Sequence, residues 1–76
     1  MALIRSFEET RKERVSLHEE ISAKYCIIER DGRTLVQIDT YGRTSREMPG
    51  KISQSVQLDR TGAERLVEIL KAAFGI

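Results

Sequence analysis

Residues 25–38 read YCIIERDGRTLVQI, two apolar runs on either side of Asp31-Gly32. An Asp-Gly pair in this setting is typical of a β-hairpin, because a type I′ turn needs positive φ at both turn positions. A two-residue turn aligns three apolar pairs across the strands: Ile28 with Leu35, Ile27 with Val36, and Tyr25 with Ile38. Such pairs hold a hairpin in register. The sequence therefore predicts a hairpin, with its second strand running on to Tyr41.

A third strand is predicted over residues 52–58. The preceding residues 42–50 hold two glycines and the only proline, which is typical of a loop. Within 52–58 the residues alternate, so Ile52, Val56 and Leu58 are expected on the core side. Gln54 interrupts that apolar side and needs a hydrogen-bond partner or an edge position.

A C-terminal helix is predicted over residues 60–74, with Asp59 as its N-cap and Gly75 as the glycine after its end. Its apolar residues recur at helical spacing and form one stripe. They are Ala63, Leu66, Val67, Leu70, Ala73 and Phe74.

The N-terminal part, residues 1–22, is dense in charge and is predicted to form a solvent-exposed helix. Ser6 followed three residues later by Glu9 matches a capping box. The apolar residues Phe7, Val15 and Ile21 give only a ragged stripe. Residues 17–24 have an alternative, an extended run that leads into the first strand.

These elements predict one α+β domain over residues 1–76. Its small antiparallel sheet, the hairpin plus a third strand, spans residues 24–58 and is backed by the amphipathic helix 60–74. The other face of the sheet must be solvated, paired with a second copy, or used for binding.

Chain length indicates where the stability comes from. A chain of 76 residues buries only about 60% of its unfolded surface. Cys26 is the only cysteine and His18 the only histidine, so neither a disulfide within the chain nor a structural zinc is expected. We therefore expect a homodimer, and no metal or cofactor.

Compartment and membrane contact follow from simple features. No apolar run approaches the roughly 18 residues that a membrane span needs. The first five residues become charged too quickly for a secretory signal. A lone cysteine fits a reducing compartment. We expect a cytoplasmic protein without membrane contact.

Charge is balanced over the whole chain but not locally. Thirteen basic residues face twelve acidic ones, whereas nucleic-acid-binding proteins often have a clear positive excess. Residues 30–51 nevertheless hold five basic residues against three acidic ones. A locally basic face is therefore expected.

Catalytic chemistry has little support. His18 lies in the charged N-terminal part, and Cys26 lies within a strand with no histidine nearby to activate it. Asp39, Glu47 and Lys51 invite comparison with magnesium-dependent nucleases. Those enzymes usually place the second acid and the lysine two residues apart on one strand, whereas here four residues separate them. We expect no enzyme.

A binding constellation runs from residue 37 to residue 57, and Arg33 precedes it as a further candidate. Basic residues can contact phosphates, an aromatic ring can stack on a base, and amides can donate hydrogen bonds, the mixture that holds single-stranded nucleic acid. The expected binding residues are Arg33, Tyr41, Arg43, Arg46, Lys51, Gln54 and Gln57. The alternative is a polar loop beside a solvated sheet face.

The order of elements from residue 35 to residue 74 resembles the positive cofactor 4 family of transcriptional coactivators, including its small bacterial members. The matching stretches are Val36–Tyr41, Met48–Lys51, Val56–Leu58 and the helix Arg60–Phe74. The resemblance implies a curved sheet, a dimer built through the helices, and single-stranded DNA on the sheet. It makes Tyr41 the stacking residue, and Arg43, Arg46 and Lys51 the backbone contacts. Tyr41 stands where many members have tryptophan.

Two hypotheses of different classes remain. In the first, the chain is a dimeric binder of nucleic acid, with single-stranded DNA favoured, and serves transcription or DNA metabolism. In the second, it is a protein-interaction module that docks a larger partner through its helix or sheet edge. The near-neutral net charge suits the second.

Overall fold

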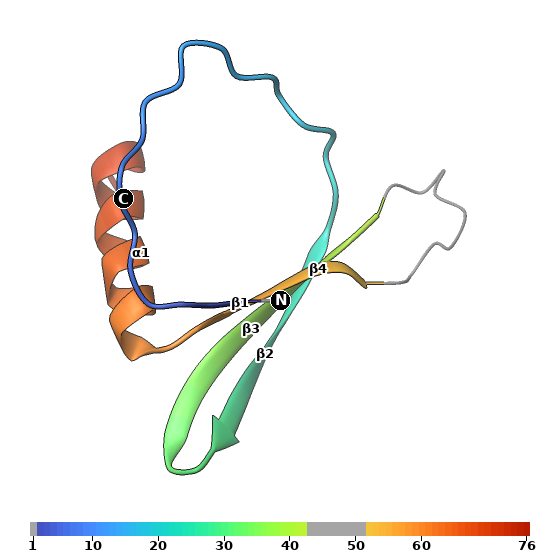
Figure 1. Cartoon of the computed structure of the whole chain (residues 1–76), viewed down its shortest axis with the longest axis vertical. Helices are drawn as coiled ribbons and strands as arrows, with labels where there is room; N and C mark the ends of the chain where they lie inside the picture. The colour runs from blue at the N-terminus through green and yellow to red at the C-terminus, as the bar shows by residue number, and fades with distance from the viewer. Residues whose placement is uncertain (1, 43–51) are drawn as a thin grey trace.

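The computed structural model describes residues 2–42 and 52–76. Along the chain these form strands β1 (Ala2–Ile4), β2 (Ala23–Arg30), β3 (Arg33–Tyr41) and β4 (Ile52–Leu58), followed by helix α1 (Arg60–Phe74). Figure 1 shows the four strands as one sheet, with α1 at its side. The predicted α+β fold and C-terminal helix are confirmed.

The hairpin has the predicted register. β2 and β3 pair antiparallel, and the three predicted apolar pairs all occur. Asp31 and Gly32 have φ values of 53° and 71°, so both turn residues are left-handed, as a type I′ turn requires.

The sheet is mixed, which corrects the prediction of an antiparallel sheet. Its strand order is β1-β4-β3-β2, and β1 runs parallel to β4 with Ala2 opposite Val56 and Ile4 opposite Leu58. β3 and β4 are antiparallel, as expected. The additional strand is short, but it gives the apolar start of the chain a place beside β4.

The predicted N-terminal helix is wrong. Residues 5–22 contain no helix and form an irregular arch between β1 and β2 (Figure 1). Phe7, Val15 and Ile21 are eight and six residues apart, which gives a helix no continuous apolar side. A helix of this length without packing is marginal in water. Val15 and Leu17 are accordingly 72% and 97% exposed.

The two faces of the sheet differ in character. Residues that lie opposite each other on neighbouring strands point to the same face. One face, here called the apolar face, takes two apolar residues from each strand: Ala2, Ile4, Tyr25, Ile27, Val36, Ile38, Val56 and Leu58. The opposite face, here called the polar face, contains Gln37, Asp39, Ser55 and Gln57 on β3 and β4. The apolar residues Leu3, Ile28 and Leu35 lie on the same side, beside and beyond this polar group.

One strand residue departs from its predicted place. The pairing of β3 with β4 shifts register at Thr40 and Tyr41, so that Tyr41 lies opposite Ile52. Ile52 is 45% exposed and not in the core where it was predicted. A β-bulge of this kind turns the end of a strand away from its regular alternation.

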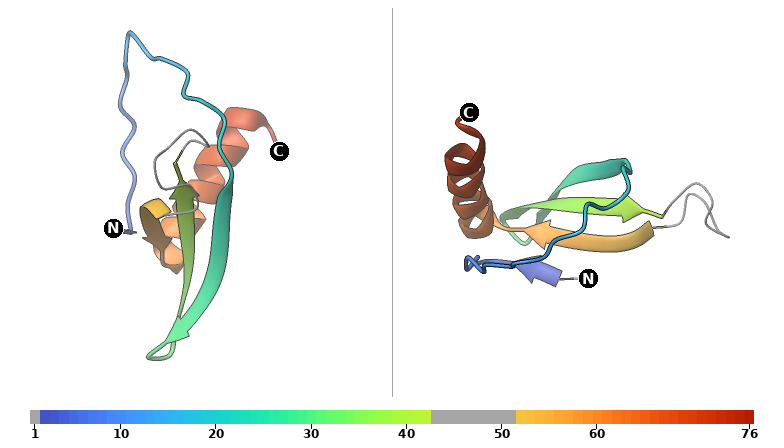
Figure 2. Two further views of the ribbon diagram at one scale, coloured as in Figure 1. Left: turned by 90° about the vertical axis from the view of Figure 1, so that its right-hand side faces the viewer. Right: turned by 90° about the horizontal axis from the view of Figure 1, so that it is seen from above.

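Helix α1 follows β4 directly and packs chiefly against that strand. Figure 1 and the right view of Figure 2 show it at one end of the strands. Four residues of its apolar stripe remain exposed to solvent: Val67, Leu70, Ala73 and Phe74. No helix in residues 2–42 or 52–76 is long and apolar enough to cross a membrane.

The core of the single chain is small. Among the described residues Leu58 is the one buried large hydrophobic side chain, at 7% exposure. The chain exposes 7227 Å² and has a radius of gyration of 14.7 Å. Compact proteins of this size expose about 4,700 Å² and have a radius near 11.4 Å. The single chain therefore covers its apolar surface incompletely.

Candidate nucleic-acid interface

The polar face carries a continuous chain of side-chain hydrogen bonds. The amide of Gln57 donates to Oε1 of Gln37 at 2.9 Å, and the amide of Gln37 donates to Oδ1 of Asp39 at 3.0 Å. The hydroxyl of Ser55 donates to the same oxygen of Asp39 at 2.7 Å. These bonds link two cross-strand pairs of β3 and β4 into one hydrogen-bonded row, in which Asp39 accepts from both Gln37 and Ser55.

An aromatic ring and a cation lie at one end of this row. Tyr41 lies beyond the register shift, and the contact of its ring with Lys24, which lies opposite Asp39, places it beside the polar face. Nζ of Lys24 lies 5.3 Å from the centre of the Tyr41 ring, within the range of a cation–π interaction. The row thus ends in an aromatic ring and a positive charge.

The structure separates some of the predicted binding residues. Gln57 lies on the polar face and Tyr41 beside it, whereas Gln54 lies opposite Thr40 on the other side of β4. Arg33 begins β3 and Tyr41 ends it, so the two side chains lie at opposite ends of the sheet. Arg43, Arg46 and Lys51 lie outside the described residues.

Four residues of this group were missing from the predicted site: Gln37, Asp39, Ser55 and Lys24. Gln37 and Asp39 share the polar face because they alternate along β3, and Ser55 lies opposite Asp39. Lys24 follows from the hairpin, since a turn at Asp31-Gly32 places residue 24 opposite Asp39. Extending the predicted register by one more residue beyond Tyr25 would have found it.

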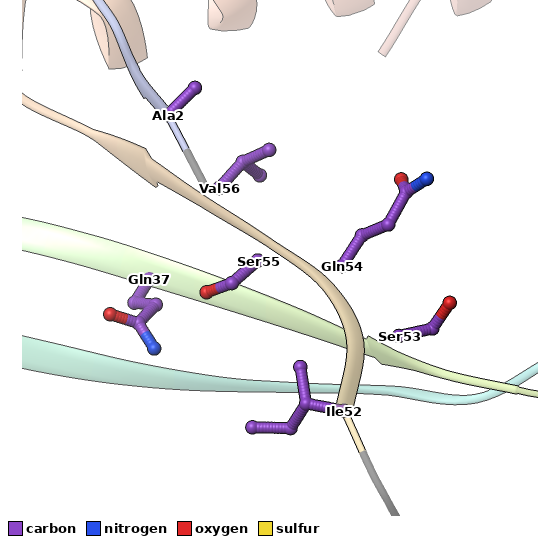
Figure 3. A pocket seen from close by; sticks show the side chains of 7 residues that line it. All are labelled: Ala2, Gln37, Ile52, Ser53, Gln54, Ser55 and Val56. Carbon is purple, nitrogen blue, oxygen red and sulfur yellow. The ribbon is translucent and has the colours of Figure 1, made fainter.

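A pocket of about 550 Å³ lies around the free edge of β4 (Figure 3). Among residues 2–42 and 52–76, β1 pairs with residues 56–58 and no strand pairs with this edge at residues 52–55. Val56 and Gln54 point to one side of the strand, and Ser55 and Gln37 to the other. The pocket therefore wraps around a strand edge and reaches both faces.

A joint between β1 and α1 holds the opposite end of β4. Oδ1 of Asp59 accepts the backbone N–H of Gly62 at 2.9 Å, which caps the helix. Oδ2 of the same carboxylate lies 2.8 Å from Nε of Arg5. The hydrogen bond from Gly62 has the largest effect and lowers the pKa of Asp59 below its ordinary value of 3.8; burial opposes it, and the charges of Arg5 and Arg33 add to the lowering.

Because the folded-state pKa of Asp59 is lowered, its carboxylate stabilises the fold fully above pH 3.8, and this contribution is lost as the pH falls through the folded-state value. Asp59→Asn keeps a capping oxygen but removes the charge. We expect Asp59→Asn to lower the unfolding temperature at pH 7. At a pH below the folded-state pKa of Asp59, where the carboxylate is protonated, the substitution should leave the unfolding temperature nearly unchanged. Thermal unfolding followed by circular dichroism at both pH values tests this, and an equal difference at both would contradict it.

The chemistry available on these surfaces is hydrogen bonding, stacking and charge. The described residues contain no group of three or more His, Cys, Asp or Glu placed to hold a metal ion. Cys26 is exposed on the polar face, opposite Gln37.

Comparisons of this chain with protein-family models, with curated proteins and with solved structures found no match.

Proposed function

We propose that this chain is a homodimeric binding domain for single-stranded nucleic acid, with single-stranded DNA favoured, and that it binds on the polar face without catalysing a reaction. The division of the sheet into two unlike faces is the observation that supports this best. The polar face offers ordered amide groups, while the apolar face is available to a second copy.

Three further features support the ligand class. Tyr41 provides one aromatic platform, and stacking on such a platform is sequence-tolerant because every base has a π-face. Lys24 adds a cation beside the ring. The chain segment that leaves β3 after Tyr41 and enters β4 at Ile52 carries three basic residues in its sequence.

Fluorescence anisotropy of labelled oligonucleotides, single-stranded and double-stranded, tests the proposal at two salt concentrations. We expect tighter binding of the single strand, weakening as salt rises, because each neutralised phosphate releases counterions. An affinity that is equal for both forms, or no binding at low salt, would contradict the proposal.

Variants of Tyr41 and Lys24 test the site. Tyr41→Ala is expected to weaken binding by roughly 5- to 150-fold, the equivalent of one stacked base, whereas Tyr41→Phe keeps the ring and the affinity. Lys24→Ala is expected to weaken binding and to reduce the salt dependence, while Lys12→Ala, in the arch, removes an equal charge without effect. Equal losses for Lys24 and Lys12 would mean that charge acts non-specifically.

The second candidate function, docking of a different protein, is favoured by one observation. Leu17 and Val15 are almost fully exposed in the arch, outside both faces of the sheet. Exposed apolar residues at such positions mark interaction sites when they gather in a patch. Failure of every oligonucleotide to bind, together with dimeric protein in solution, would favour this candidate.

A further inference from the structure

Two apolar surfaces of this chain have no partner among the described residues. The first is the β2 half of the apolar face, where Tyr25 and Ile27 are 74% and 67% exposed. The second is the exposed stripe of α1, where Val67, Leu70 and Phe74 are 49%, 37% and 71% exposed. The spacing of these three places them on one side of the helix.

These two surfaces do not meet within one chain, because the start of α1 is fixed at the end of β4. The Asp59 cap and the Arg5–Asp59 ion pair tie the helix start to β1. Gly62 packs directly against the backbone of Ile4, which leaves no room for a side chain there. α1 therefore stands at the end of the strands (Figures 1 and 2), away from the outer strand β2.

The uncovered area is sufficient for a stable dimer. The chain exposes 7227 Å², about 2,500 Å² more than a compact protein of its mass. A standard interface buries about 800 Å² per partner, and obligate homodimers bury more. Part of the excess exposed area comes from the arch. The area that each chain buries in a standard interface is nevertheless well under half of that excess.

We infer that a second copy of this chain covers both surfaces, with α1 of each copy lying across the β2 half of the other copy's apolar face. A two-fold axis makes this exchange reciprocal, so one arrangement covers two sheet faces and two helix stripes. An amphipathic helix on an apolar sheet face is a standard layer packing. The polar face stays open to ligand on both copies.

This arrangement rests on the proposed function only for its dimeric state. It is tested without nucleic acid, so either can fail while the other holds.

Light scattering coupled to size-exclusion chromatography, over a range of protein concentrations, tests the inference first. The unaltered chain should be a dimer. Ile27→Glu and Phe74→Glu each place two charges in the interface and should weaken dimerisation by about 100-fold or more. Leu17→Glu makes the same kind of change on a 97% exposed residue outside both surfaces and should leave the dimer intact. A monomeric unaltered chain, or dissociation by Leu17→Glu as well, would overturn the inference.

Cysteine cross-linking tests the contact itself and is independent of whether the glutamate variants fold. In a Cys26→Ser background, chains with Ile27→Cys are mixed with chains with Val67→Cys under mild oxidation. A covalent dimer that forms in the mixture, and much less in either variant alone, is the expected result. A covalent dimer of Val67→Cys alone, with none added by mixing, would show helix against helix and overturn the exchange.

Discussion

Leu58→Ala is expected to unfold most of the domain. Leu58 is 7% exposed and lies between Ile4 of β1 and Val36 of β3, at the point where three strands and the start of α1 meet. Truncation of a buried leucine costs about 2–5 kcal/mol, through lost transfer free energy and the cavity that remains. Small domains have about 5 kcal/mol or little more in total.

Urea denaturation followed by circular dichroism measures the effect. Leu17→Ala is the matched control, because Leu17 is 97% exposed and its truncation should change the free energy of unfolding by less than about 0.5 kcal/mol. Protein concentration must be the same for all samples, since the stability of a dimer depends on it. Equal stability of the Leu58 and Leu17 variants would mean that Leu58 is not the centre of the core.

The sheet and the helix could be predicted because their signals are local. Asp31-Gly32 sets the turn, the turn sets the register, and the register decides which residues share a face. The apolar stripe between Asp59 and Gly75 has a cap at each end, so the helix bounds were predictable as well.

The N-terminal part could not be predicted in the same way. Charge density and a capping-box match in residues 6–9 favoured a helix, but a cap adds little without an apolar side to pack. The pairing of β1 with β4 joins residues more than 50 positions apart, and no local pattern specifies such a pairing. In the N-terminal part, the local preference for a helix was overridden by the pairing of β1 with β4.

Only part of the candidate site could be predicted, because residue type is a local signal whereas the face of a residue depends on strand pairing. Tyr41 and Gln57 were identified from residue type, whereas Lys24 required the hairpin register. Gln54 was placed in the site because it is polar and near Gln57, although the alternation of β4 puts the two on opposite faces. The composition of a segment gives the ligand class, and the face of each residue decides which side chains can act together.

Gly62→Ala is expected to destabilise the domain, although alanine normally stabilises a helix by about 1 kcal/mol relative to glycine. A β-carbon at this position would overlap the carbonyl oxygen of Ile4 and lie 3.1 Å from its carbonyl carbon. Both are backbone atoms of β1 beside the start of α1, so a side-chain rotation cannot relieve the overlap. Overpacking of this kind costs about 1–3 kcal/mol and here outweighs the helix gain.

Thr61→Ala is the matched control, because Thr61 is exposed in the same turn of α1 and alanine there should be neutral or slightly stabilising. Hydrogen exchange then locates the strain. If β1 yields, the β1 amides that bond to β4 lose protection in Gly62→Ala while the α1 amides keep theirs, since the Asp59 cap is untouched. A Gly62 variant as stable as the Thr61 variant, with β1 still protected, would mean that β1 does not pack against the start of α1, and the joint that holds α1 at the end of the sheet would have to be abandoned.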